Sequence, residues 1–120
     1  MDKLGRNELF YKICDKKECD VFNLLKKEEN INFQDINGCS YLHVAVDNRM
    51  LNIVKELVNK KANINIKDKY GRTPLMIALS SYNGDRTIID FLIEKGADVN
   101  AETENGVSCK QIAKMKGVNI

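Results

Sequence analysis

The sequence contains no tryptophan, one proline, one histidine and no long hydrophobic run, and the last two exclude a His-rich metal site and a membrane span. A membrane-spanning helix needs roughly 18 or more consecutive apolar residues, and no stretch approaches that length, so we expect no membrane partner. The N-terminus has no apolar run of the kind that forms a secretory signal. We therefore expect a cytoplasmic protein, either in its own cell or in a host cell.

The four cysteines, Cys14, Cys19, Cys39 and Cys109, show no paired CxxC spacing. Zinc sites usually use closely spaced cysteines or histidines, so we expect no metal and no other cofactor. Free thiols are expected because disulfides are rare in the cytosol. The seven glycines are spread along the chain and form no phosphate-binding loop. The net charge is only +2, with both signs mixed, which argues against a nucleic-acid partner.

One motif is present twice at a spacing of 33 residues and returns once more in degraded form. The copies are 35–45, 68–78 and 103–113. A fixed period of this length indicates stacked units, each too small to bury its own apolar face. The sequence therefore predicts an all-α repeat solenoid.

The middle copy explains how one unit is built. Residues 68–72 form a tight turn, for which Gly71 supplies the backbone freedom. Thr73 is a good N-cap, and Pro74 stands at the first helical position, where its missing N–H has no cost. A short inner helix and a longer outer helix should follow, with apolar residues at helical spacing. Those positions are Leu75, Ile77, Ala78 and Leu79, then Ile88, Ile89, Leu92 and Ile93.

The period and the Thr73-Pro74-Leu75 motif resemble the ankyrin repeat. The resemblance implies helix-turn-helix units with β-hairpin-like turns, stacked here as about three and a half units. It also implies a non-catalytic, monomeric module that binds another protein through a concave surface of hairpin tips and inner helices. His43 falls on the family's structural histidine, which bonds hydroxyl and backbone groups around the turn.

We expect one domain, 1–120, divided into an N-terminal capping repeat (about 6–33), two full repeats (34–66 and 67–101) and a C-terminal half-repeat cap (102–120). The first unit should have two helices and no hairpin before them. Lys12 and Lys110 occupy positions that are apolar in the other units. Burying an ammonium group is expensive, so the faces that carry them should meet water. The alternative is that the chain was cut from something longer.

The repeat 67–101 contains a two-residue insertion. Ala78 and Ile88 are ten residues apart, whereas Ala45 and Ile53 are eight apart. The extra residues lie within 80–86, between the inner and outer helices. They are either a tolerated loop insertion or a protrusion specific to a partner.

The resemblance places the partner-binding positions between the residues that hold the stack together. Ile36 and Tyr70 are the expected anchors, because the fold does not require large side chains on these turns; alternatively, both pack against neighbouring hairpins. The basic residues nearby favour a partner with an acidic patch. The full set is Ile36, Asn37, Cys39, Asp47, Asn48, Lys67, Lys69, Tyr70, Arg72, Ser80, Ser81, Glu104 and Asn105.

Several functions remain open from the sequence. The module could be a bacterial immunity protein that neutralises a toxin, a microbial or viral effector that captures a host protein, or a regulatory subunit. The outer-helix side could also bind. An enzyme would need a Cys39/His43 nucleophile pair, for which no orienting carboxylate or oxyanion hole has a recognisable signature.

Overall fold

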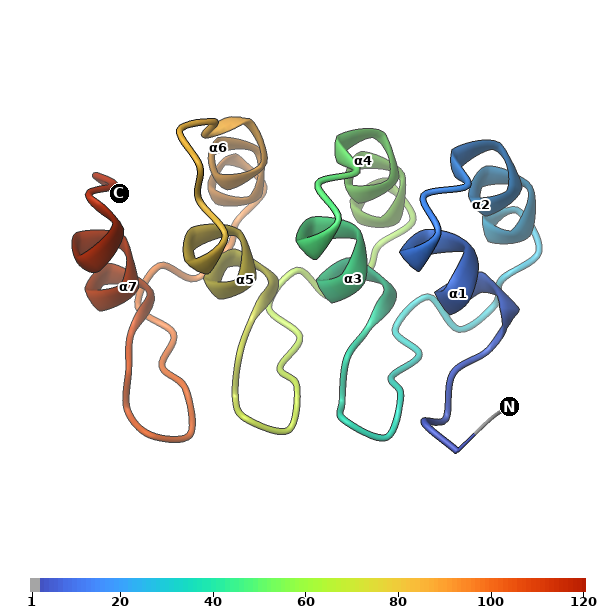
Figure 1. Ribbon diagram of the computed structural model, residues 1–120, viewed down its shortest axis with the longest axis horizontal. Helices are drawn as coiled ribbons and strands as arrows, with labels where there is room; N and C mark the ends of the chain where they lie inside the picture. The colour runs from blue at the N-terminus through green and yellow to red at the C-terminus, as the bar shows by residue number, and fades with distance from the viewer. Residues whose placement is uncertain (1–2) are drawn as a thin grey trace.

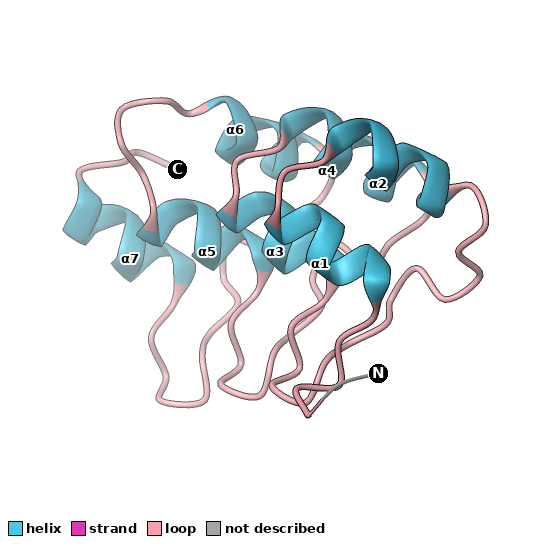
Figure 2. Ribbon diagram, turned by 45° about the vertical axis from the view of Figure 1, so that its right-hand side comes forward, coloured by secondary structure: helices cyan, strands magenta, loops and turns pink. Residues whose placement is uncertain are grey.

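The computed structural model describes residues 3–120, and this part of the chain forms seven α-helices and no named strand. The helices are α1 (Glu8–Cys14), α2 (Glu18–Leu25), α3 (Tyr41–Asp47), α4 (Leu51–Asn59), α5 (Pro74–Ser80), α6 (Thr87–Glu94) and α7 (Cys109–Lys116). They form two rows, with α1, α3, α5 and α7 inside and α2, α4 and α6 outside (Figure 1). Hairpin-like turns extend below the inner row, away from the outer helices (Figure 2). The predicted all-α repeat solenoid is confirmed.

The core lies between the rows and between successive units. Each inner helix packs against the next inner helix, and each outer helix packs against the inner helix of its own unit. Leu42, Leu75 and Leu79 are at most 1% exposed, and the outer-helix residues Ile53 and Leu92 are fully buried. Apolar burial contributes roughly 25 cal/mol per Å², so the shared faces between units provide most of the stabilisation.

The inner helices α3, α5 and α7 begin after hydroxyl N-caps, of which Thr73 was predicted from the sequence. Ser40, Thr73 and Ser108 precede α3, α5 and α7, and each side-chain oxygen accepts the backbone N–H three residues further on, at 3.2–3.4 Å. Pro74 is the first residue of α5, as predicted. These bonds fix the point where each hairpin ends and its helix starts.

Buried aspartates hold the hairpin turns in shape. Asp68 Oδ1 accepts the backbone N–H groups of Tyr70 and Arg72, both at 2.9 Å. Asp35 makes the equivalent pair of bonds in its own turn, at 2.8 and 2.9 Å. Both aspartates are 6% exposed, so their carboxylates stabilise the turns and are not presented to solvent.

Adjacent turns are joined through their backbones. The bonds run from Ile36 N to Leu4 O (2.8 Å), from Lys69 N to Asn37 O (3.0 Å) and from Glu104 N to Tyr70 O (2.9 Å). The turns approach so closely that a Cβ at Gly38 or Gly71 would lie 2.7 or 2.6 Å from the next turn's backbone nitrogen. Glycine is therefore required at both positions by contact as well as by its positive φ.

The first unit has more of a turn than the sequence predicts. Leu4 supplies the carbonyl that bonds the second unit, and Gly5 has a φ of +70°, like the turn glycines that follow. The Arg6 Nε donates to Asp35 Oδ2 at 3.1 Å. The segment 4–6 therefore stacks on the hairpin of the second unit in the place of a hairpin of its own.

Tyr41, which replaces proline after the Ser40 cap, is fully buried. Its hydroxyl accepts a hydrogen bond from Asn7 Nδ2 (2.7 Å) and donates one to Glu28 Oε2 (2.9 Å). Its ring stacks on Phe33 at 5.8 Å between centroids. The tyrosine therefore links the first unit to the second, which the proline of α5 could not do.

The insertion lies in the loop between α5 and α6, as predicted (Figures 1 and 2). In the two preceding units, a single residue with positive φ, Lys16 or Arg49, is the middle residue of the short link between inner and outer helix. In the third unit the longer loop uses Gly84 instead, with a φ of +107°. This loop borders a cavity of about 180 Å³ whose floor includes Ala78 and Ile89.

The lysines at the ends of the array meet water. The Lys12 side chain is 35% exposed, with its Nζ 3.7 Å from Asp20 Oδ2, and Lys110 is exposed on α7. The prediction that neither ammonium group is buried between units is confirmed. The longest helix in residues 3–120 is α4, with nine residues, and none is long and apolar enough to cross a membrane.

Candidate functional site

All thirteen predicted binding residues reach the surface, although not as one patch. Most are exposed, and Asn37, Cys39, Asn48 and Ser81 are half-buried. One group lies on the hairpin turns, which join the inner helices at their N-terminal ends. The other group, Asp47, Asn48, Ser80 and Ser81, lies at the C-terminal ends of α3 and α5. Seven helical residues span about 10 Å, so the structure divides the predicted set into a turn cluster and a helix-end cluster.

Tyr70 is the centre of the turn cluster. Its ring is 51% exposed, with Lys69 Nζ 5.1 Å and the Arg72 guanidinium carbon 5.3 Å from the ring centroid. Cations at this distance attract an aromatic face. The two cations belong to the same turn as the tyrosine, so they hold the ring in place while leaving half of it accessible.

The charges around Tyr70 are mixed. Arg72 Nε lies 2.7 Å from Oδ2 of the buried Asp68, which offsets most of its charge locally. Lys67 Nζ donates to the Glu102 carbonyl at 3.3 Å. The next turn brings the exposed Glu104 close, since its N–H bonds to the Tyr70 carbonyl. Lys69 is therefore the cation in this cluster that is most available to an acidic partner.

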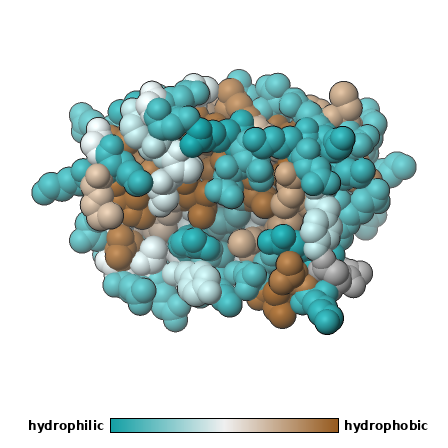
Figure 3. Space-filling model, viewed as in Figure 1, coloured by the Kyte–Doolittle hydropathy of each residue, from teal (hydrophilic) through white to brown (hydrophobic). Residues whose placement is uncertain are grey.

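Ile36 is 66% exposed on the turn of the second unit. In Figure 3, hydrophobic side chains reach the surface low on the molecule, among the turns nearest the N-terminus, and again at the level of the inner helices. The surrounding surface is mainly hydrophilic. Burying an exposed isoleucine against a partner would release roughly 1.5–3 kcal/mol.

The helix-end cluster includes a residue that sequence reasoning missed, Arg49. Its Nη2 donates to the Ser81 carbonyl at 2.6 Å, which joins the link after α3 to the inserted loop after α5. Ser81 Oγ in turn donates to the Ile77 carbonyl at 2.9 Å. The signal that could have found Arg49 is its place after Asn48, where a short link between helices demands a positive φ.

The Cys39/His43 neighbourhood does not form a nucleophile pair in the described structure. The Ser40 N–H donates to His43 Nδ1 at 3.1 Å, so Nε2 carries the proton and donates to the Arg72 carbonyl at 2.8 Å. Burial lowers the pKa of His43 and keeps the ring neutral. Burial, reinforced by the nearby Asp35 carboxylate, raises the pKa of the Cys39 thiol. Both imidazole nitrogens form hydrogen bonds with backbone groups, as expected for a structural histidine.

Metal ligands are also not brought together in residues 3–120, where no three His, Cys, Asp or Glu side chains are placed to hold an ion. The four cysteines are free thiols, as expected.

Comparison with known proteins identifies the fold's family. The ankyrin repeat family, represented by three copies of the repeat, matches residues 9–103, and the chain belongs to this family. The BTB/POZ domain and ankyrin repeat-containing protein NPR3 of rice is 31% identical over 122 residues, covering 98% of this chain and 20% of the rice protein. The putative ankyrin repeat protein FPV230 of fowlpox virus is 39% identical over 71 residues, covering 56% of this chain and 37% of the viral protein.

Ankyrin repeats are generally protein–protein interaction modules and are typically non-catalytic. The chain spans between about a fifth and somewhat over a third of the length of these two relatives. The activities of the whole relatives therefore do not transfer to it.

Proposed function

We propose that this chain is a non-catalytic module that binds a partner protein through its turn cluster and helix-end cluster. The supporting observation is the exposure of Ile36 and Tyr70 on turns whose shape is fixed by backbone and aspartate hydrogen bonds. Large apolar or aromatic side chains in rigid settings are typical interface anchors, and rigidity lowers the entropy cost of binding.

The partner should carry an acidic group beside an apolar pocket. Lys69 lies next to the exposed Tyr70 ring and would attract that acidic group, mainly raising the association rate and the specificity. The mixed charges nearby, including Glu104, limit the acidic patch to a small one.

We propose that the setting is the cytoplasm of a cell or of a host cell, where free thiols persist. As a finer version, we propose a viral or microbial effector that captures a host protein, since viral ankyrin repeat proteins are among the proteins similar to this chain. A second fowlpox virus protein, the putative ankyrin repeat protein FPV233, is 47% identical over 51 residues. A bacterial immunity protein would use the same surface against its toxin.

The test is to remove the anchors and keep the fold. The partner would first be captured from the native source with the wild-type chain, then purified for titration calorimetry. The variant Ile36→Ser/Tyr70→Ser should weaken binding at least about tenfold, while its unfolding free energy changes by less than about 0.5 kcal/mol per site. Lys69→Glu should slow association. Arg72 is left unchanged because it pairs with the buried Asp68.

The matched control is Met115→Ser, which removes an apolar side chain that is 76% exposed on α7, outside both clusters. It should bind as wild type does. Normal binding by the double variant, or an equal loss in the control, would show that the turn cluster is not the interface.

A further inference from the structure

The face formed by the outer helices contains a groove of about 810 Å³, and it lies away from the turns. It runs along α4, with residues of α2 on one side and of α6 on the other. The size is within the range of sites that bury a ligand or several side chains. The groove shares no residue with the turn cluster or the helix-end cluster.

Phe91 of α6 is half-buried in this groove, between lysines from two neighbouring units. Lys55 Nζ of α4 is 5.9 Å and Lys95 Nζ is 5.8 Å from the ring centroid. In the described residues neither ammonium group forms a salt bridge with a carboxylate. Two cations on one aromatic ring repel each other, and no carboxylate in the described residues lies within salt-bridge distance of either one.

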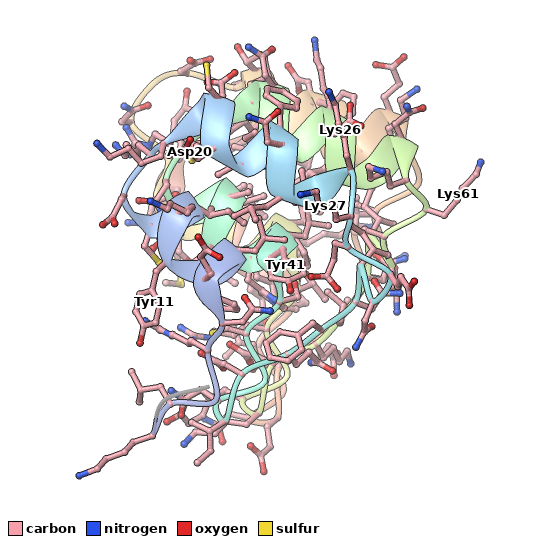
Figure 4. The ribbon with its side chains drawn as sticks, turned by 90° about the vertical axis from the view of Figure 1, so that its right-hand side faces the viewer. Tyr11, Asp20, Lys26, Lys27, Tyr41 and Lys61 are labelled. Carbon is pink, nitrogen blue, oxygen red and sulfur yellow. The ribbon has the colours of Figure 1, made fainter. Side chains whose placement is uncertain are left out.

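The charged side chains that line the groove are mainly basic. Lys55, Lys61 and Lys95 line it against one acid, Glu56. Lys61 has a φ of +71° and projects outward from the loop after α4, on the side where Lys26 and Lys27 follow α2 (Figure 4). The groove therefore attracts negative charge, although the chain as a whole is nearly neutral.

Part of the groove lining is apolar. Phe22, Val58, Ile64 and Phe91 line it and are all half-buried. Aromatic and aliphatic walls with a basic rim match a ligand that is apolar in the centre and acidic at its edges. Nucleic acid fits less well, because tracking a phosphate backbone needs a longer array of cations, and the groove wall also carries Glu56.

We propose that the outer-helix groove binds an acidic amphipathic segment of a second protein. An aliphatic or aromatic side chain of that segment contacts Phe22 and Phe91, and its carboxylates pair with Lys55 and Lys95. This site is independent of the turn cluster, so the module can hold two proteins at once, one on each side of the stack.

The experiment is an NMR titration of the ¹⁵N-labelled chain with a synthetic amphipathic peptide that carries leucines on one face and glutamates beside them. A matched peptide has lysine in place of every glutamate. We expect the acidic peptide to shift the amides of α4 and α6 and the ring signals of Phe91, and the basic peptide to leave them unchanged. The variant Lys55→Glu/Lys95→Glu should weaken the interaction at least about tenfold, because like charges then face each other.

The control variant is Lys114→Glu/Lys116→Glu, which makes the same change in net charge at exposed positions of α7. It should bind the acidic peptide as wild type does. An equal loss in both variants, shifts centred on the turns, or tighter binding of duplex DNA or phosphatidylserine vesicles through the same lysines would overturn the proposal. If the groove variant loses its dispersed spectrum, Lys55→Met/Lys95→Met is used; it should also weaken binding, by a smaller factor, because it removes the attraction without adding repulsion. None of these outcomes depends on Ile36 or Tyr70, so the result is separate from the test of the turn cluster.

Discussion

At the scale of single residues, Gly71 and Gly106 share a backbone conformation and differ in their surroundings. Their φ angles are +79° and +80°, but a Cβ on Gly71 would lie 2.6 Å from Glu104 N, whereas nothing lies within 4 Å of one on Gly106. We expect Gly71→Ala to cost about 1–3 kcal/mol more unfolding free energy than Gly106→Ala. Urea denaturation measures the difference. Equal losses would mean that the turns do not depend on close contact.

His43 should make stability depend on pH. Burial lowers the pKa of His43 below the ordinary value of 6.5. As the pH falls below 6.5, the unfolded chain therefore binds a proton more readily than the folded chain does. The histidine's contribution is complete above 6.5 and declines as the pH falls toward the folded pKa. As the sequence has one histidine, His43→Gln should remove this slope and also lower stability by about 1–3 kcal/mol at neutral pH.

Urea denaturation at a series of pH values, together with a proton NMR titration of the single imidazole, measures both effects. An imidazole pKa at or above 6.5 in the folded chain would contradict the expectation.

Some residue roles could be predicted from the sequence and others could not. Thr73 and Ser40 were identifiable as caps, because a hydroxyl before an apolar run has one common use. The role of Tyr41 was not, because its partners Asn7 and Glu28 are remote in sequence and meet it only in the folded stack. Gly5 stands 33 residues before Gly38, so extending the period backwards would have shown its turn position.

At the scale of elements, the repeat pattern predicted the helix pairs and the place of the insertion. The links between inner and outer helices were less predictable, because Lys16 and Arg49 adopt a positive φ that is uncommon for residues other than glycine. The residue types give no sign of it; only their place in a short link between two helices indicates it.

The inserted loop should tolerate shortening. Deleting Asn83 and Gly84 restores the spacing of the other units and leaves the Arg49–Ser81 bond outside the deletion. We expect the unfolding free energy to change by less than about 1 kcal/mol, because loop closure depends weakly on length. Thermal and urea unfolding measure this. A loss above about 2 kcal/mol would mean that the loop supports the stack, and weaker partner binding at unchanged stability would show that the loop contacts the partner.

At the scale of the whole molecule, the 33-residue period of the sequence predicts the solenoid, but it does not predict which surface residues come together. The outer-helix groove takes its walls from three successive outer helices, and no single repeat shows the pairing of Lys55 with Lys95 around Phe91. The division of the expected binding residues into two clusters has another cause, the length of the inner helices, whose two ends carry the two clusters. A sequence motif records which positions are variable, whereas distances across a stack depend on how units pack.

The stack presents two faces with different chemistry. The turns carry exposed apolar residues with mixed charges, and the outer helices carry a basic rim over aromatic walls. Because the inner helices and their core separate these faces, a substitution on one face should leave the other unaffected.

Three of the bonds that join successive turns use main-chain atoms alone: the amides of Ile36, Lys69 and Glu104 donate to carbonyls of the turn before. The alignment that these three bonds give to successive units therefore does not depend on the side chains at those positions. An aliphatic, a cationic and an anionic residue occupy equivalent places here. Evolution or protein design can therefore change the residues at these positions, one turn at a time, to alter partner binding while the backbone bonds between turns remain.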